Sequence, residues 1–156
     1  MPTVMIVGAS RGIGLELARQ YAQARWRMHA TTRTPDNPGA LGRIAGDVVL
    51  HELDVRDGNH IAVVASAVSD EGIDVLIHNA GVQDDILPPE EVVQINAEAP
   101  LKVTEALLPA LGRGTQKKVL LTTSQLGARR GSVRSLGTYG DSKAALNDAF
   151  RQRAPE

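Results

Sequence analysis

The sequence predicts an α/β fold in which helices cover both faces of a parallel, doubly wound sheet. Short runs rich in β-branched residues alternate with longer segments rich in Ala and Leu. Strands separated by helix-length segments are typical of βαβ units with right-handed crossovers. The first run, residues 4–7, is apolar throughout and leads directly into a turn that contains three glycines. A continuous apolar run indicates a strand that is buried on both faces, as in parallel sheets.

Each further element is predicted from a local pattern. Residues 12–24 place apolar side chains at helical spacing, which predicts a helix. At the other end of the chain, Pro155 is expected to end the last helix. Pro100 and Pro109 are expected to divide residues 90–111 into two helical pieces, because proline lacks the amide hydrogen of a helical bond. The expected strands are residues 4–7, 27–32, 47–53, 74–78 and 117–123, and the expected helices are residues 12–24, 59–69, 90–111 and 139–153.

Length and composition suit a single domain that spans residues 1–156. Aromatic residues make up only 3% of the chain, so the core must be aliphatic. The net charge of −1, with both signs interspersed, gives no reason to expect nucleic acid or a membrane as a partner. The absence of cysteine excludes disulfides, thiolate catalysis and Cys-based zinc sites. No apolar run approaches the roughly 20 residues that span a bilayer, so we expect a cytoplasmic protein.

The glycine turn after the first strand is suited to binding phosphate. Its sequence is Gly8-Ala9-Ser10-Arg11-Gly12-Ile13-Gly14. Glycines permit a tight turn, close approach of the backbone to a pyrophosphate, and close packing of helix on strand. The N-terminus of the following helix offers unpaired N–H groups and a positive dipole end. The spacing G-x-x-x-G-x-G is neither the common G-x-G-x-x-G nor a P-loop, and we interpret it as a Rossmann-type dinucleotide site.

Polar residues follow all the other expected strands. Arg33 follows the second, Asp54 the third and Asn79-Ala80-Gly81 the fourth, and Ser124 closes the fifth. The carboxyl ends of parallel strands meet at one edge of the sheet, where ligands of open α/β sheets bind. Together with the glycine turn, these residues predict a groove long enough for a dinucleotide.

These residues, in this order, resemble the short-chain dehydrogenase/reductase family from residue 3 to about residue 153. The matching residues are Gly8-Ala9-Ser10-Arg11-Gly12-Ile13-Gly14, Asp54-Val55, Asn79-Ala80-Gly81, Asn96, Ser124 and Tyr139-Gly140-Asp141-Ser142-Lys143. Residues 11–17 and 142–147 look like the C-factor-like branch of the family. The resemblance implies a Rossmann-type sheet with the strand order 3-2-1-4-5 for the strands present, and a homo-oligomer formed through helices around residues 97–111 and 139–153.

Tyr139 and Lys143 are separated by one helical turn, so their side chains share a face. A neighbouring ammonium favours the ionised form of a phenol, whose ordinary pKa near 10 is too high for acid–base work at neutral pH. The resemblance implies that Tyr139 exchanges a proton with a carbonyl or alcohol oxygen and that Ser124 hydrogen-bonds the same oxygen. It also implies that Lys143 holds the nicotinamide ribose and that Asn96 supports Lys143 through a bound water. Ser132 or Ser135 is the alternative to Ser124.

Arg33 indicates which dinucleotide is bound. An acidic residue after the second strand would accept hydrogen bonds from the ribose hydroxyls of NAD, whereas a guanidinium suits the 2′-phosphate of NADP. Arg11 is within reach of the same phosphate, so we expect NADP(H) in preference to NAD(H). The expected cofactor-binding residues are Gly8, Ser10, Arg11, Gly12, Ile13, Gly14, Arg33, Asp54, Val55, Asn79, Ala80, Gly81, Tyr139 and Lys143, and the expected catalytic residues are Asn96, Ser124, Tyr139 and Lys143.

Other polar clusters carry weaker signals. The four histidines show no spacing of metal ligands, and we expect packing or surface roles for His29, His51, His60 and His78. We interpret Asp84-Asp85 and the cluster Arg129-Arg130 with Arg134 as solvated loops. The chain has no Gly-x-Ser-x-Gly elbow of a serine hydrolase.

The chain departs from the family after the Tyr-x-x-x-Lys helix. Thirteen residues follow Lys143, from 144 to 156, so we expect the family's later strands to be missing and the fifth strand to form an exposed sheet edge. Two hypotheses follow. The first is an NADP(H)-dependent oxidoreductase that interconverts a small-molecule carbonyl and alcohol. The second is a catalytically weak nucleotide-binding or signalling module of the same family.

Overall fold

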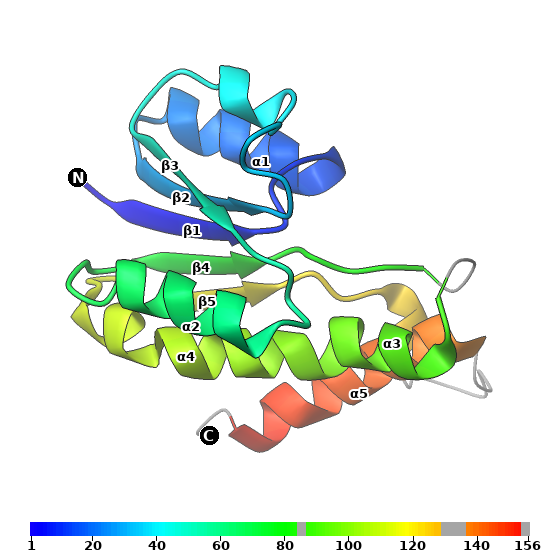
Figure 1. Ribbon diagram of the computed structural model, residues 1–156. Helices are drawn as coiled ribbons and strands as arrows, with labels where there is room; N and C mark the ends of the chain where they lie inside the picture. The colour runs from blue at the N-terminus through cyan, green and yellow to red at the C-terminus, as the bar shows by residue number, and fades with distance from the viewer. Residues whose placement is uncertain (84–86, 129–136, 154–156) are drawn as a thin grey trace.

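The computed structural model describes residues 1–83, 87–128 and 137–153. Its strands form one parallel sheet in the order β3-β2-β1-β4-β5, which confirms the predicted fold class and strand order (Figure 1). The strands are β1 (Thr3–Val7), β2 (Arg27–Thr32), β3 (Val48–Glu52), β4 (Val75–His78) and β5 (Lys118–Leu121).

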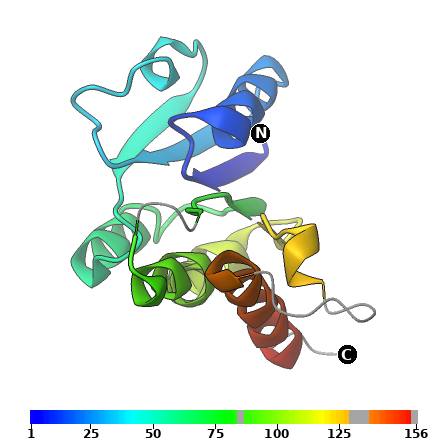
Figure 2. The same ribbon diagram turned by 90° about the vertical axis from the view of Figure 1, so that its right-hand side faces the viewer.

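Helices cover the two faces of the sheet unequally. Helix α1 (Gly12–Gln23) lies on one face, and α2 (Gly58–Ala67), α4 (Ala99–Arg113) and α5 (Gly137–Arg153) lie on the other (Figures 1 and 2). Each face carries its own apolar cluster. Both clusters are aliphatic, as the composition predicts. The short 3₁₀ segments are η1 (Leu41–Arg43) and η3 (Gln125–Gly127).

The helical region before β5 differs from the prediction. Helix α3 (Pro89–Val93) runs through a π-helical segment, η2 (Gln94–Glu98), into α4. The N–H of Ala99 bonds to the carbonyl of Gln94, and this wider turn lies just before Pro100, which has no N–H to donate. The predicted break at Pro109 is wrong, because α4 continues through it to Arg113. Leu107, Ala110 and Leu111 on either side of it are buried, and this packing offsets the single missing hydrogen bond.

Strand β5 lies at the edge of the sheet, as predicted, and most of it is open to solvent. Val119 is 38% exposed and Leu120 is 45% exposed. Alternate side chains of a strand point to opposite faces, so both faces of β5 are partly uncovered.

The amino-terminal edge of the sheet is held together by two acidic side chains, those of Asp74 and Glu71, that sequence analysis did not single out. Asp74 precedes β4 and is 6% exposed. Its Oδ2 accepts from the Thr3 amide at 2.8 Å, and its Oδ1 accepts from Thr115 N and Oγ1 at 2.7 and 2.6 Å and from Gln116 N at 3.2 Å. These bonds, chiefly that from the Thr115 hydroxyl, lower the pKa of Asp74 to about 2. The carboxylate of Asp74 thus links the starts of β1 and β4 to the residues just before β5.

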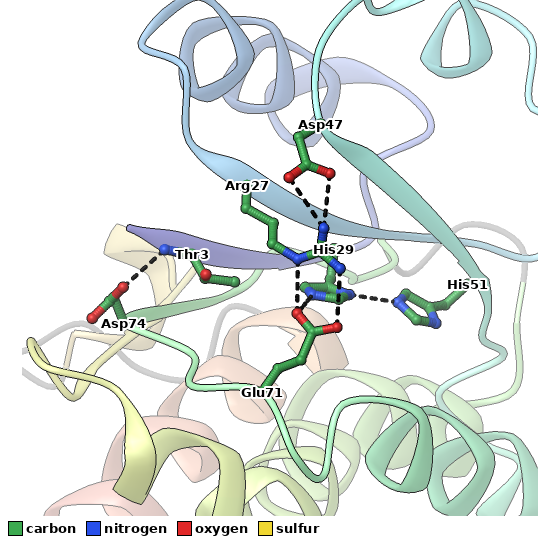
Figure 3. A network of polar contacts seen from close by, with 7 residues as sticks. All are labelled: Thr3, Arg27, His29, Asp47, His51, Glu71 and Asp74. Atoms are coloured by element: carbon green, nitrogen blue, oxygen red, sulfur yellow. Dashed lines mark hydrogen bonds and ion pairs between the residues drawn. The ribbon is translucent and has the colours of Figure 1, made fainter. Parts of the chain in front are cut away.

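Glu71 organises a second network at the same edge (Figure 3). It accepts two hydrogen bonds from Arg27, at 2.8 and 3.0 Å, while Arg27 also pairs with Asp47. The Nε2 atom of the buried His29 lies 2.9 Å from Glu71, and its Nδ1 lies 2.9 Å from Nε2 of His51. An ionised carboxylate only accepts, so a neutral His29 donates from Nε2 and accepts from His51 at Nδ1.

No group of three or more His, Asp or Glu side chains in the described part of the chain could hold a metal ion. Within the same residues, none of the helices has the length and apolar character that crossing a membrane requires. The cytoplasmic location stays a prediction. Asp84, Asp85, Arg129, Arg130 and Arg134 lie outside the described residues.

Candidate functional site

The glycine turn connects β1 to α1 through two close backbone contacts. Gly8 has φ +82°, and a Cβ there would lie 2.8 Å from the Cα of Ala80. A Cβ on Gly14 would collide with the carbonyl oxygen of Gly8, which also accepts a 3.1 Å hydrogen bond from Asn79 Nδ2. Only glycine fits at these two positions without a backbone shift. The turn therefore rests directly on the loop after β4.

The start of α1 is open to solvent. Ser10, Arg11, Gly12 and Ile13 are all exposed, and the side chain of the N-cap residue, Arg11, makes no capping hydrogen bond. The first turn contains no acidic residue. Its N–H groups and positive dipole end are therefore available to an anion.

Asp54 follows β3 at the same edge and is held by a residue that sequence analysis missed. Both of its carboxylate oxygens accept from the guanidinium of Arg56, at 3.0 and 2.7 Å, and Arg56 also pairs with Glu91 on α3. The hydrogen bonds from Arg56 lower the pKa of Asp54 to about 2, and the charge of Arg33 adds to this effect. Arg33 itself is exposed, and Val55 beside Asp54 is buried.

Lys143 is a buried charged residue of the candidate site. Its side chain is on α5, is 4% exposed, and donates from Nζ to the carbonyl oxygen of Thr122 at 2.8 Å. Burial lowers the pKa of Lys143. The Nζ atom lies 5.8 Å from the centre of the Tyr139 ring, so the two side chains share a helix face.

Asn96 lies within the π-helical segment η2 and is fully buried. Its amide exchanges two hydrogen bonds with the backbone of Val82, at 2.9 and 2.8 Å, and donates a third to Ser142 at 3.1 Å. A Cβ on Gly81 would lie 3.2 Å from Asn96 Oδ1 and 3.5 Å from Lys143 Nζ. The missing side chain at Gly81 therefore leaves a space within reach of both polar atoms.

Ser124 is the N-cap residue of the 3₁₀ segment η3 and does not close the fifth strand as predicted, because β5 ends three residues earlier, at Leu121. Ser124 is half-buried, and its Oγ accepts a 3.2 Å hydrogen bond from the Leu126 amide. A Cβ on Gly127 would lie 2.7 Å from the Lys143 carbonyl carbon, so η3 packs directly on α5. The fold thus brings the Ser124 turn to the helix that carries Tyr139 and Lys143. The alternative residues Ser132 and Ser135 lie outside the described residues.

His78, the last residue of β4, is a further polar group that the prediction did not connect with the site. It is 2% exposed, and within the described part of the chain its Nε2 has no hydrogen-bond partner. Desolvation, with the nearby charge of Lys143, lowers its pKa to about 3, so His78 is neutral at physiological pH. In the sequence, the position of His78 beside Asn79 is the one feature that connects it with the candidate site.

The strand order and the turn between β1 and α1 define a Rossmann-type α/β protein. The family model for short chain dehydrogenases matches residues 2–156, and the chain therefore belongs to this family of oxidoreductases.

Individual relatives agree with this assignment. The chain is 30% identical to retinol dehydrogenase 8 from Bos taurus, in an alignment that covers 97% of this chain and 53% of the relative. It is 32% identical to estradiol 17-beta-dehydrogenase 1 from Rattus norvegicus over 78% of this chain and 40% of the relative. A carbonyl reductase from Pseudomonas aeruginosa PAO1, solved in complex with NADP, has a TM-score of 0.84 at 31% identity, covering 98% of this chain and 75% of that one. The chain spans about half the length of these two curated relatives.

Proposed function

We propose that the protein is an NADP(H)-dependent oxidoreductase that interconverts a small-molecule carbonyl and alcohol by hydride transfer. The observation that carries the proposal is that Tyr139 and buried Lys143 share a face of α5, and that the Ser124 turn packs on the backbone of this helix. The loop at residues 80–81 connects this helix to the glycine turn, since Ala80 packs on Gly8 and Gly81 lies beside Lys143. A phenol beside an ammonium, with a serine hydroxyl close by, suits proton transfer to an oxygen that gains charge.

The residues at the edge of the sheet fit NADP(H). A Cβ on Gly12 would meet no atom within 4 Å, so the turn is open there for its backbone to approach a pyrophosphate, and the exposed start of α1 suits the negative charge. Arg11 and Arg33 are exposed cations at the ends of β1 and β2, where the adenosine ribose of a bound dinucleotide would lie. Their charge favours a 2′-phosphate. The NADP-bound carbonyl reductase from Pseudomonas aeruginosa is a similar protein that binds this cofactor.

Each catalytic residue has one task in the proposed reduction. Bound NADPH would supply the hydride. Tyr139 would give its hydroxyl proton to the carbonyl oxygen, and Ser124 would donate a hydrogen bond to the same oxygen. Lys143, with its Nζ near the Tyr139 ring, would favour the phenolate left behind and hold the nicotinamide ribose. Asn96 would support Lys143 through a water in the space beside Gly81.

Turnover tests this proposal. With saturating NADPH and a panel of small aldehydes and ketones, the protein should oxidise NADPH, and Tyr139→Phe should lower kcat by about 10²–10⁴-fold, the usual size of an acid–base contribution. Tyr21→Phe is the matched control, because Tyr21 lies on α1, on the other face of the sheet, and packs against Trp26. NADPH binding without turnover of any carbonyl would contradict the enzyme hypothesis. It would favour the nucleotide-binding module expected of the C-factor-like branch.

We also propose that the protein forms a homo-oligomer through α4 and α5. Leu108 on α4 is 56% exposed, and Arg153 of α5 pairs with Glu105 of α4, so the two helices present a joint surface. Size-exclusion chromatography with light scattering should show a species larger than 16.6 kDa. A monomer at micromolar concentration would refute this part of the proposal.

A further inference from the structure

The turn that carries Ser124 is held on both sides by one amide side chain. Thr123 Oγ1 donates to Asn147 Oδ1 at 2.8 Å, and Asn147 Nδ2 donates to the carbonyl oxygen of Gly127 at 3.3 Å. Thr123 precedes Ser124 directly, and Gly127 closes the 3₁₀ turn that Ser124 begins. Asn147 therefore uses its acceptor and its donor to span the turn.

Asn147 belongs to the same stripe of α5 as the proposed catalytic pair. Tyr139, Lys143 and Asn147 are spaced at i, i+4 and i+8, which places them on one helix face. Lys143 bonds to Thr122, the residue before Thr123. This face thus holds the chain after β5 at three points, residues 122, 123 and 127.

Gly127 allows the turn η3 to pack closely against α5. A Cβ there would lie 2.7 Å from the Lys143 carbonyl carbon and 2.8 Å from the Ala144 nitrogen. Because both atoms belong to the helix backbone, a larger residue would push η3 away from α5. The amide of Asn147 bonds to residues on both sides of this contact and so helps to fix how the turn lies on the helix.

We propose that Asn147 is a positioning residue that directs the Ser124 hydroxyl toward the oxygen to which Tyr139 gives its proton. This inference rests on the proposed function. Ser124 Oγ accepts from the Leu126 amide, so its own hydrogen can be directed at a substrate oxygen. The direction in which the Ser124 hydroxyl points depends on how the turn is positioned. A displacement of about 1 Å at a reacting group can lower a rate by about 10²-fold. Asn147 acts through Ser124 and touches no reacting atom.

The experiment compares variants in the same chain, with NADPH saturating. Asn147→Leu removes donor and acceptor at nearly constant size, and Thr123→Val removes one of the two bonds. We expect Asn147→Leu to lower kcat by about 10-fold and Thr123→Val by about 3-fold, with the Kd of NADPH changed by less than 2-fold. Thr123→Ser, which keeps the hydroxyl, should restore wild-type kcat. Gln152→Leu, at an exposed position of the same helix, is the matched control.

Two results would overturn the proposal. The first is an unchanged kcat in Asn147→Leu. The second is a loss of kcat that matches the loss of NADPH binding and of folded protein, since that would show a merely structural role. The double variant Thr123→Val/Asn147→Leu should be no worse than Asn147→Leu alone, because both changes break the same linkage.

Hydrogen exchange separates failure of this inference from failure of the proposed function. Gly127 N bonds to Ser124 O and Ala128 N bonds to Gln125 O within the turn. These two amides should exchange faster in Asn147→Leu and Thr123→Val than in wild type and Thr123→Ser, whether or not the protein turns over a carbonyl. Equal exchange in all four proteins would refute the positioning role by itself.

Discussion

At the amino-terminal edge of the sheet, Asp74 accepts four hydrogen bonds and Glu71 is bonded to both Arg27 and His29. At the carboxyl-terminal edge, the side chain of the N-cap residue of α1 makes no capping hydrogen bond, and within the described residues the buried Nε2 of His78 has no partner. The first edge satisfies its polar groups from within the chain, which stabilises the fold. The carboxyl-terminal edge leaves hydrogen-bond donors and charges without partners from the described residues, which costs stability. Such a cost is usual at sites that bind a ligand.

The largest effect on stability is expected at the amino-terminal edge. Asp74→Ala leaves the amides of Thr3, Thr115 and Gln116 without their acceptor and should lower the free energy of unfolding by about 3 kcal/mol. Urea denaturation at pH 7 measures this change. NADPH affinity, measured on folded protein, should stay within 2-fold of wild type. A larger loss of affinity would show that the two edges are not separate in function.

The corresponding change at the carboxyl-terminal edge is Gly14→Ala. The new Cβ meets the Gly8 carbonyl, and the backbone shift that relieves such overpacking costs about 1–3 kcal/mol. Because the shift falls in the proposed phosphate turn, NADPH affinity should fall by about 10–100-fold. Fluorescence titration of NADPH measures this. Gly58→Ala is the control, since its Cβ would meet no atom within 4 Å. Unchanged affinity in Gly14→Ala would show that the turn does not hold the phosphates.

Acid should remove the stability that the amino-terminal edge provides. The pKa of Asp74 lies near 2 in the folded protein, below its ordinary 3.8. Its contribution, about 2 kcal/mol, is therefore fully present well above pH 4 and is lost as the pH falls toward 2. Asp74→Asn should flatten the curve of unfolding free energy against pH in this window.

The titration of His51 affects the stability of the fold at higher pH than that of Asp74. The pKa of His51 is lowered to about 4 by burial, so its charging disfavours the folded state from about pH 6.5 downward in wild type and variant alike. Parallel curves for wild type and Asp74→Asn between pH 4 and pH 2 would contradict the role assigned to Asp74.

The smallest effect is expected at His78. Within the described residues the buried Nε2 of His78 has no partner, so replacing His78 with an apolar side chain of similar size should be neutral or should stabilise the protein, by at most about 1 kcal/mol. Thermal unfolding of His78→Leu, compared with His29→Leu, measures the contrast. His29→Leu should be destabilised because it breaks bonds to Glu71 and His51. Equal losses in both variants would show that His78 has a partner when the protein is in solution.

The sheet, and the polar residues that it brings to its carboxyl-terminal edge, could be predicted because their signals are local. An apolar run, a glycine turn and a helix-length segment are each short and continuous in the sequence, and several of the family motifs directly follow a strand. The amino-terminal network could not be predicted in this way. Asp74 bonds to Thr3 and Thr115, which lie 71 and 41 residues away. Nothing near residue 74 indicates either partner.

The same reason explains the missed details of the site. Arg56 lies only two residues from Asp54, but its bond to Glu91, 35 residues away, forms only when the loop after β3 and α3 come together. Continuation of α4 through Pro109 depends on burial of its neighbours. Asn147 shows its helical spacing from Lys143 in the sequence, but its contact with the Ser124 turn depends on the packing of Gly127.

Cofactor titration tests most directly whether the carboxyl-terminal edge of the sheet binds NADP(H). Wild type should bind NADPH at least about 10-fold more tightly than NADH, the size expected of a charge-assisted hydrogen bond to the 2′-phosphate. Arg33→Asp should abolish or reverse this preference, whereas Arg113→Asp, at the far end of α4, should leave it unchanged. Tighter binding of NADH by wild type, or no binding of either dinucleotide, would contradict the account.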